Sequence, residues 1–470
     1  MVERAGTRLT TNNSLGGERD LLIEKFGGDV LGAHGEGLDD VLRRLMEFKS
    51  RHLLVLSALR GVTDALKEYN KTKNESLLQE RLVSSYLSDH FNSAISESLN
   101  LKAYMKNLRA MTDAEVLGLG EILSTDLLYS FLKAKGVNVG KVNFLNVNTR
   151  TDSQTIEPNL EFPIVAKQFR VYDADPDLEA SRSKMREVKE LLGKHDVVVT
   201  PGFVARYRDG RAVTLGRGGS DTSLFVYADC LGVPQGILWK STEGVRSANP
   251  DIVPRHRLVK YFTSLEGLNL TLFGGDIVNF KGMAIAYKSD ITVKVAFVKD
   301  SQIFTTISRE NPSGETKEQP AVKYVGGTAD AVLLHFDLER MKNRVDRLVE
   351  RNLGDFVHIF GPALNPTVAA LDATKYYEIS DEEGWSERDG MRVAAVGIIG
   401  EGLGEMRGAL AEAAKVLGDL GVVIRGNLAA TRRGTQGGYM TFFVDRPDYE
   451  RVVRAEHACF VEKRSDVEMP

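Results

Sequence analysis

Cysteine is scarce in this chain, and its scarcity narrows the classes of protein to consider. The two cysteines, Cys230 and Cys459, lie far apart among 470 residues. Two distant thiols make neither a disulfide framework nor a zinc site, so we expect a protein of the reducing cytoplasm. The eight histidines form no HxxxH or HxH cluster. We therefore expect no metal site built from imidazole and assign no metal ligands.

Long apolar runs and long basic runs are also missing. No stretch approaches the roughly 20 apolar residues that span a bilayer, so we expect no membrane partner. The formal net charge is −4, which does not indicate nucleic acid as a partner. Residues 1–19 are polar and read as a flexible tail rather than a signal peptide. The hydrophobic fraction of 42% and the length of 470 residues predict a globular protein with two or three domains.

The stretch Leu215–Asp221 carries the strongest chemical signal. It places three glycines, an arginine, a serine and an aspartate within seven residues. An apolar run at 197–199 precedes it and a helical pattern from Ser223 follows, which predicts a glycine loop entering a helix. Such a loop can hold an anion, Arg217 can grip a carboxylate, and Asp221 can hold an ammonium group or, through water, a metal. A surface loop with solvated charges fits the glycine spacing equally well.

The first 300 residues alternate between buried strands and helices, which predicts an α/β fold. The expected strands are 21–26, 53–56, 142–145, 164–166, 197–199, 236–239 and 291–298. The expected helices begin near 37, 120, 180, 223 and 265, with a polar helical excursion over 65–117. Residues 300–322 show little periodicity and are expected to form a linker.

The remainder reads as two copies of a small β-α-β-β-α-β unit. The first copy has expected strands at 331–334, 356–360 and 368–371, a helix at 337–352 and no clear second helix. The second has expected strands at 392–399, 422–424, 440–444 and 458–461, and helices at 404–420 and 449–456.

Several stretches, in this order, resemble the aspartate kinases of the amino acid kinase superfamily. They are Glu24-Lys25-Phe26-Gly27-Gly28, Ser57-Ala58 with Val62-Thr63-Asp64, Gly120-Glu121 with Ser124, Gly202-Phe203, and Thr214 to Asp221. The terminal repeat, ending in Glu456-His457-Ala458-Cys459-Phe460, resembles the paired ACT modules that bind amino acid effectors.

The resemblance implies a three-layer αβα kinase domain followed by two ferredoxin-like ACT modules. The implied boundaries are a kinase domain at 20–299, a linker at 300–322, and ACT-like modules at 323–385 and 386–470. The implied reaction is the transfer of a phosphoryl group from ATP, with Mg²⁺, to the side-chain carboxylate of L-aspartate. The modules would bind an amino acid effector and join chains into a homodimer or higher homo-oligomer.

The resemblance also assigns roles to residues. Lys25, Arg217 and Asp221 would be catalytic, with Lys25 reaching the transferred phosphoryl group and Arg217 holding the substrate α-carboxylate. Glu121 would hold the substrate ammonium group, and the other substrate-binding residues would be Ser57, Thr63, Gly218, Gly219 and Ser220. The nucleotide would contact Lys25, Gly27, Gly28, Lys240, Ser241 and Arg246.

This chemistry suits the residues present. The nucleophile is a carboxylate that is already ionised at neutral pH, so no general base is needed. The difficulty is to bring one anion against another, which requires cations, backbone donors and Mg²⁺.

The nucleotide half departs from the family pattern. Asp29-Val30 stands in place of a Thr-Ser pair, Lys240-Ser241 in place of Thr-Asp, Arg246 in place of an aromatic residue, and Asp276 in place of a lysine. Three explanations stay open: a nucleotide held differently, an amino acid kinase acting on another small carboxylate, or a non-catalytic amino acid sensor. In the second module Thr435-Gln436-Gly437-Gly438-Tyr439-Met440 replaces residues that contact effectors in the family, so the effector is not assigned.

Overall fold

The structure is a computed structural model, and it describes residues 20–463 apart from 88–98, 149–154, 274–276, 311–321, 336–356, 361–366, 384–389, 405 and 431–437. The expected tail 1–19, the expected helix 337–352, Asp276 and Thr435-Gln436-Gly437 lie outside the described residues. The chain divides into two compact units. The first comprises residues 1–244 and 281–306, and the second comprises residues 245–280 and 307–470.

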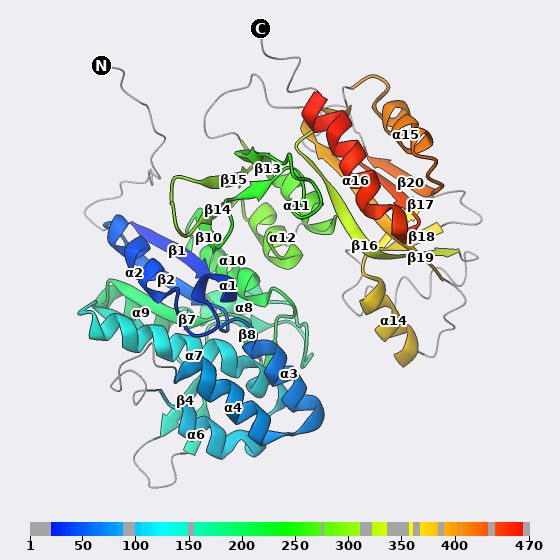
Figure 1. The fold of residues 1–470 in the computed structure, drawn as a ribbon. Helices are drawn as coiled ribbons and strands as arrows, with labels where there is room; N and C mark the ends of the chain where they lie inside the picture. Colours follow the sequence, from blue (N-terminus) through cyan, green and yellow to red (C-terminus); the bar gives the residue numbers. More distant parts are fainter. Residues whose placement is uncertain are drawn as a thin grey trace, which may run out of the picture. The chain divides into compact units, whose positions relative to one another are not determined.

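The first unit is built on a parallel sheet (Figure 1). Six of its strands lie in the order β14-β10-β1-β2-β7-β3. Their bounds are β14 (Thr292–Phe297), β10 (Gln235–Lys240), β1 (Leu21–Phe26), β2 (Arg51–Leu56), β7 (Val197–Pro201) and β3 (Val139–Lys141). The central strands are almost wholly buried, as expected for a parallel sheet covered on both faces. The predicted α/β architecture is confirmed here.

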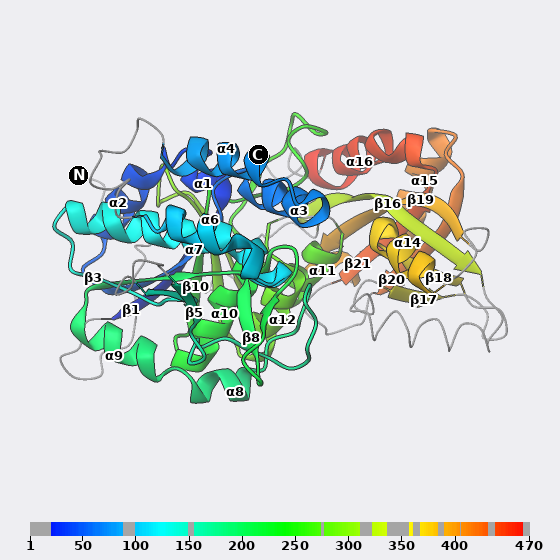
Figure 2. The same cartoon turned by 90° about the horizontal axis from the view of Figure 1, so that it is seen from below.

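Helices cover both faces of this sheet, as Figure 2 shows. Helices α2 (Leu38–Glu47) and α7 (Asp113–Ala134) lie on one face, and α8 (Leu178–Ser183), α9 (Arg186–Lys194) and α10 (Gly219–Leu231) lie on the other. The layering follows from right-handed β-α-β connections. The helices after β1 and β2 lie on one face, and those after β3 and β7, where the chain runs back across the sheet, lie on the other. In the described part of the chain, no helix combines the length and the apolar character needed to cross a membrane.

Several sequence expectations in this unit need correction. The strand expected at 142–145 is wrong, because β3 ends at Lys141 and the next strand, β4, begins only at Leu145. The helix expected from Gly120 begins seven residues earlier, at Asp113, because Thr112 and Glu115 form a capping box there. Its glycines do not end it: a Cβ at Gly120 would lie 2.5 Å from the Ala58 Cβ, so this glycine serves close packing. The helix expected over 180–192 is two helices, α8 and α9, which break at Lys184-Met185. Within the expected linker, Phe304–Ser308 forms strand β15.

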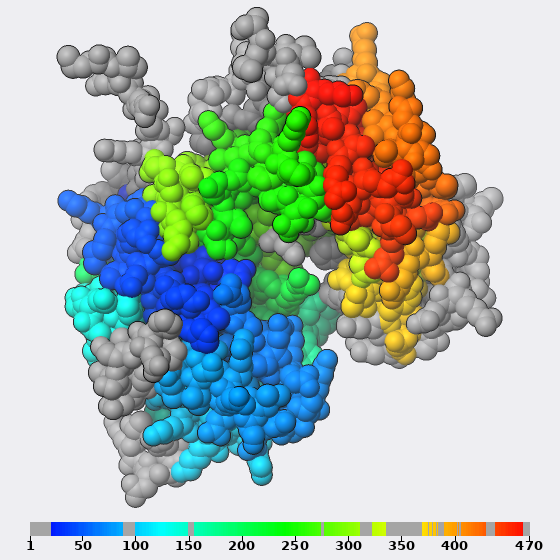
Figure 3. Space-filling view, viewed as in Figure 1, coloured from blue at the N-terminus to red at the C-terminus, as the bar shows by residue number. Residues whose placement is uncertain are grey.

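The predicted helical excursion is confirmed. It contains α3 (Val62–Thr72), α4 (Glu75–Tyr86), α6 (Leu101–Asn107) and the short η1 (Leu108–Ala110). In Figure 3 the mid-blue atoms of α3 and α4 form an exposed surface of the first unit. The smaller strands are β4 (Leu145–Asn148), β5 (Thr155–Pro158), β6 (Val165–Ala166), β8 (Val204–Tyr207) and β9 (Ala212–Thr214). The short helix α1 (Gly28–Leu31) follows β1, and α12 (Phe280–Lys288) precedes β14.

The second unit centres on a sheet in the order β17-β18-β16-β19-β21-β20. Its strands are β16 (Tyr324–His335), β17 (Val357–Phe360), β18 (Thr367–Ala370), β19 (Gly390–Gly400), β20 (Ile424–Ala430) and β21 (Gly438–Val444). Its helices are α11 (Ser264–Leu272), α14 (Ala373–Glu382), η4 (Glu401–Gly404), α15 (Ala409–Asp419), η5 (Arg446–Asp448) and α16 (Tyr449–His457). Short strands β11 (Val245–Arg246), β12 (Leu258–Val259) and β13 (Tyr261–Thr263) precede α11.

The two repeats therefore share one sheet, joined where β16 pairs antiparallel with β19. The expected last strand at 458–461 is wrong, because residues Ala458–Glu462 continue from α16 as a π-helix, η6. No glycine or proline separates the two segments, and the sheet position beside β19 is already taken by β16. The second helix of the first repeat, for which the sequence showed no clear pattern, is α14.

A buried ion pair ties the segment 245–280 to this sheet. Lys323 Nζ lies 2.8 Å from Glu266 Oε2, and both side chains are fully buried. The other oxygen of Glu266 accepts a hydrogen bond of 2.6 Å from the backbone N–H of Glu401, directly after β19. Because each charge is compensated within the core, the segment and the sheet form one body.

Candidate functional site

A buried ion pair marks the carboxyl edge of the parallel sheet in the first unit. Lys25, the penultimate residue of β1, lies between Leu238 of β10 and Val55 of β2. Its Nζ is 2.7 Å from Oδ1 of Asp221 at the start of α10, and both side chains are less than one-tenth exposed, at 9% and 7%. Ligands of open α/β folds bind at this edge, so the pair lies where a site is expected.

Two glycines let the backbone pass close to this pair. A Cβ at Gly27 would lie 3.3 Å from Lys25 Nζ, and one at Gly28 would lie 2.7 Å from the Ala58 carbonyl oxygen. The backbone N–H of Ser57 donates to the carbonyl of Phe26 at 3.1 Å, which joins the loops that follow β1 and β2. The structure thus brings together Lys25, the glycine pair and Ser57.

The loop Leu215–Asp221 has the predicted form, a glycine turn that leads into a helix. Gly216 and Gly218 have φ angles of 83° and 70°, which only glycine adopts readily, and α10 begins at Gly219. A Cβ at Gly202 would lie 2.7 Å from the Ser220 Cβ, so the turn after β7 lies directly against the helix start. Within this loop Ser220 and Asp221 are buried, whereas Arg217 and Gly218 are exposed.

The residue after Gly202 carries a constraint that sequence reasoning did not identify. Phe203 has a φ of 67°, which is uncommon for a residue with a side chain. Its backbone N–H donates to Ser223 Oγ at 3.0 Å, and that hydroxyl donates to the carbonyl of Gly219 at 3.0 Å. The first turn of helix α10 therefore fixes the loop at Gly202-Phe203.

Glu121 is the buried acid of the site. It lies within α7 rather than at the helix start, it is 4% exposed, and its Oε2 has no hydrogen-bond partner. Burial raises the pKa of Glu121 to about 8, although the backbone N–H of Ala58 and the charge of Lys25 act in the opposite direction. A buried carboxyl group with an oxygen left unpaired is suited to a cationic ligand group.

The remaining predicted residues lie on or beside three other elements. Thr63 is half-buried in the first turn of α3, and Lys240 and Ser241 lie at and just after the carboxyl end of β10, beside β1. Arg246 belongs to β11 of the second unit. Asp173 and Lys281, which border the glycine loop, were missed because no motif surrounds them.

A hydrogen-bond network on the opposite face of β1 fixes the strand that carries Lys25. Glu24 is fully buried and accepts hydrogen bonds from Trp239 Nε1 at 2.9 Å and, on its other oxygen, from His52 Nδ1 at 2.6 Å. Burial alone would lower the pKa of His52, but the Glu24 carboxylate raises it above its ordinary value. The three side chains fix β1, β2 and β10 at the level of the site.

The geometry suits a ligand with both anionic and cationic groups. Lys25 and the backbone of two glycine turns can face an anion, and Glu121 with Asp221 can face an ammonium group. Among the residues that the structure describes, no three histidine, cysteine, aspartate or glutamate side chains gather as a metal site.

Comparison with known proteins identifies the family. Residues 20–296 match the model of the amino acid kinase family. The chain is 26% identical over 305 residues to the chloroplastic aspartokinase 1 of Arabidopsis thaliana, a match that covers 58% of this chain and 49% of that protein. It is 23% identical over 309 residues to the lysine-sensitive aspartokinase 3 of Escherichia coli, covering 62% of this chain and 66% of that protein. The matches thus span about half to two thirds of these curated relatives' lengths.

The fold agrees with this result. The structure of Escherichia coli aspartokinase III in complex with aspartate and ADP aligns with a TM-score of 0.76, covering 94% of this chain and 99% of that one at 20% identity. The aspartate kinase of Clostridium acetobutylicum aligns with a TM-score of 0.65 at 18% identity. The predicted fold class is confirmed, and the chain belongs to the amino acid kinase family.

Proposed function

We propose that this protein is an aspartate kinase, which transfers the γ-phosphoryl group of ATP to the side-chain carboxylate of L-aspartate and forms 4-phospho-L-aspartate. The observation that carries the proposal is the pairing of opposite features in one site. A buried lysine lies against the glycine pair after β1 and forms an ion pair with Asp221 at the end of the second glycine loop, and a buried glutamate with an unpartnered oxygen lies on α7. The curated relatives named above are aspartokinases, which supports the same substrate.

Each side chain has a role that its position supports. When substrate binds, Asp221 pairs with the substrate ammonium group instead of with Lys25. Lys25 is then available to neutralise charge on the transferred phosphoryl group. Arg217, which is exposed in its loop, binds the substrate α-carboxylate, and Glu121 accepts a hydrogen bond from the substrate ammonium group. Since the attacking carboxylate is ionised at neutral pH, catalysis rests on alignment and on charge compensation.

The chain's residues fit a nucleotide that carries Mg²⁺. Magnesium in such sites is held mainly by substrate phosphates and water, with one or two carboxylates from the protein. Asp29 is exposed in α1 directly after the glycine pair, and Asp221 forms an ion pair with Lys25. When bound, the ion would offset the phosphate charge. Lys240 and Ser241 border the same edge, and a nucleotide contact by Arg246 stays a prediction.

The test is the formation of an acyl phosphate. Purified protein with MgATP and L-aspartate should yield a product that hydroxylamine traps as the hydroxamate. Arg217→Ala should raise the KM for aspartate by about 10- to 100-fold, since a charge-assisted hydrogen bond contributes about 1.5–3 kcal/mol. The exposed Arg186, on α9, gives the control Arg186→Ala, which should leave the KM unchanged.

Other outcomes would point to other functions. Turnover of another small carboxylate, found with a substrate panel, would make the protein an amino acid kinase of different specificity. Stabilisation by an amino acid but not by MgATP in a thermal-shift screen would make it a non-catalytic sensor. An amino acid effector and a homo-oligomer formed through the repeats at 323–385 and 386–470, like a cytoplasmic location, remain predictions.

A further inference from the structure

The loop 167–175, here called the Asp173 loop, is closed at its base by its own hydrogen bonds. The backbone N–H of Lys167 donates to the carbonyl of Asp175 at 2.9 Å, and that of Asp177 donates to the carbonyl of Val165 at 2.8 Å. The Gln168 side chain donates to Asp175 Oδ2 at 2.8 Å. The loop therefore projects as a defined unit rather than as an open connection.

The tip of the Asp173 loop is attached to the point where the glycine loop begins. The N–H of Ala174 donates to the carbonyl of Thr214 at 2.8 Å, and the N–H of Thr214 donates to the carbonyl of Val171 at 3.0 Å. Thr214 ends β9 and directly precedes Leu215–Asp221. Asp173 has a φ of 65°, and its carboxylate lies so close to Gly216 that a Cβ there would overlap it.

Lys281, in the first turn of α12, holds the Asp173 loop in this position. Its Nζ lies 2.8 Å from Asp173 Oδ1 and 3.0 Å from Asp175 Oδ1. It also donates to the carbonyls of Asp173 and Ala174, at 3.1 and 3.3 Å. Burial alone would raise the pKa of Asp175, but Lys281 holds it below its ordinary value. One ammonium group thus contacts two carboxylates and two carbonyls.

The residue after Lys281 borders the other end of the glycine loop. A Cβ at Gly282 would lie 3.2 Å from the carbonyl oxygen of Asp221. The first turn of α12 therefore lies against Asp221 directly and against Gly216 through Asp173. Arg217 lies between Gly216 and Asp221 in the sequence.

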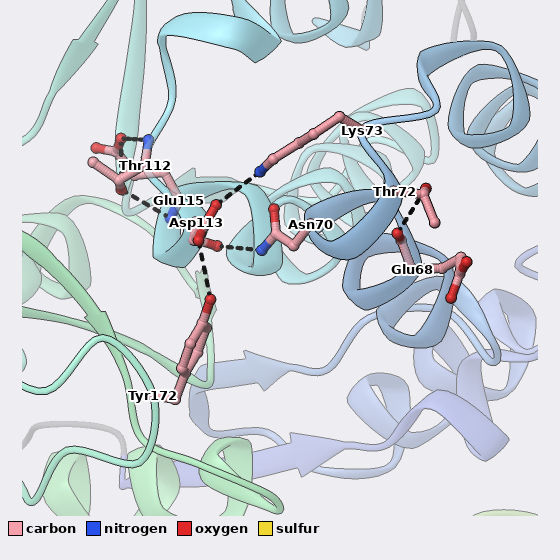
Figure 4. Close-up of polar contacts among 8 residues, drawn as sticks. All are labelled: Glu68, Asn70, Thr72, Lys73, Thr112, Asp113, Glu115 and Tyr172. Carbon is pink, nitrogen blue, oxygen red and sulfur yellow. Dashed lines mark hydrogen bonds and ion pairs between the residues drawn. The ribbon is translucent and has the colours of Figure 1, made fainter. Parts of the chain in front are cut away.

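The Asp173 loop is also tied to the helix that carries Glu121. Tyr172 Oη donates to Asp113 Oδ2 at 3.2 Å, and Asp113 is the first residue of α7. Figure 4 shows Lys73, Asn70 and Tyr172 converging on Asp113. The loop therefore links the two elements that supply the proposed aspartate-binding groups.

We propose that Lys281 is a positioning residue for aspartate binding: through Asp173 it fixes Gly216 and so sets the orientation of Arg217. This inference rests on the proposed function. Without the Lys281 clamp, the Asp173 loop would lose its hold on Gly216, and Arg217 would sample positions in which it does not meet the substrate α-carboxylate.

Steady-state kinetics of Lys281→Met test the proposal. We expect the KM for aspartate to rise by about 10- to 100-fold, the loss that follows from a misplacement of about 1 Å, with the KM for MgATP changed by less than about twofold. Lys281→Arg, which keeps the charge, should recover much of the loss. Lys288→Met removes a lysine from the exposed end of the same helix and should behave as the wild type. Equal rises in both KM values would overturn the proposal.

A double variant separates positioning from simple charge. If uncompensated carboxylates merely repelled the anionic substrate, Asp173→Asn added to Lys281→Met would restore the KM for aspartate. A positioning role predicts no such recovery, because residue 173 would still lack the Lys281 ammonium group that holds it in place. Recovery of the KM in the double variant would overturn the proposal.

Hydrogen exchange distinguishes a failure of this inference from a failure of the proposed function. Backbone amides of residues 215–221 should exchange faster in Lys281→Met than in the wild type and in Lys288→Met, with no substrate present. Unchanged exchange would overturn the positioning role whatever the substrate is. If the amides exchange faster in Lys281→Met but the wild-type protein does not phosphorylate aspartate, the positioning role is supported and only the proposed substrate is refuted.

Discussion

The high pKa of Glu121 predicts that aspartate binding is coupled to the release of a proton. In the ligand-free protein, burial raises the pKa of this side chain from 4.5 to about 8. At neutral pH most molecules therefore carry a protonated Glu121. An incoming ammonium group needs the carboxylate form, so binding must expel the proton.

The size of the effect follows from the fraction of protein that is ready to bind. Ionising Glu121 costs about 5 kcal/mol more than ionising an exposed glutamate, at about 1.4 kcal/mol for each unit of pKa. At pH 7 only about one molecule in ten carries the carboxylate, so the apparent Kd is about tenfold above its value at high pH. Each further unit of acidification should weaken binding about tenfold again.

Calorimetric titration of L-aspartate into the nucleotide-free protein measures this directly. Between about pH 6 and about pH 8 the side-chain carboxylate of aspartate stays ionised, so it contributes no pH dependence of its own. Repeating the titration at pH 7 in two buffers of different ionisation enthalpy should reveal the release of about 0.9 proton for each aspartate bound.

Matched variants separate Glu121 from other groups. Glu121→Gln should bind aspartate weakly and show little pH dependence, because the titrating group is gone. Glu68→Gln changes an exposed glutamate on α3 and should retain the wild-type pH dependence. A wild-type affinity that is flat from pH 6 to pH 8, with no proton released, would refute the reasoning.

Two further predictions concern the stability of the second unit. Glu456 is fully buried with neither carboxyl oxygen bonded, and burial raises its pKa to about 8. The folded state therefore holds this proton more tightly than the unfolded state, and stability is lost as the pH rises from about 4.5 to about 8. Glu456→Gln should leave the Tm unchanged near pH 5 and raise it by several degrees near pH 8.5 in a thermal melt; a constant difference across this range would contradict the assignment. Glu266→Gln should cost about 3–5 kcal/mol in chemical denaturation, because Lys323 stays buried without its carboxylate, and Glu266→Leu combined with Lys323→Met should recover much of it. No recovery would show that the backbone bond to Glu401 matters more than the charge pair.

The sequence predicted the elements whose signal is local. The apolar residues Leu21, Leu22, Ile23 and Phe26, with the glycine turn after them, predicted β1 with its observed bounds, since a strand buried in a parallel sheet is mostly apolar. The glycines of Leu215–Asp221 gave the turn into α10, because the left-handed angles at Gly216 and Gly218 demand glycine.

Predictions failed where a contact far along the chain overrides the local pattern. Gly120 resembles a helix start, yet it lies within α7 because its missing side chain admits Ala58. The apolar run Ala458–Val461 resembles a strand, yet the neighbouring sheet position is filled by β16, more than a hundred residues earlier in the chain. Local propensity decides only when no long-range packing competes with it.

The sequence by itself determined which residues are available for the chemistry: Lys25, Glu121, Arg217 and Asp221 stand out by type and by motif. Only the tertiary structure decided how they are used. It paired Lys25 with Asp221, buried Glu121 with an oxygen unpaired, and set Lys281 against Asp173 across 108 positions of sequence. The physical reason is that charge and burial depend on neighbours in space, and a carboxyl group becomes a proton-coupled binding group only where folding removes its water.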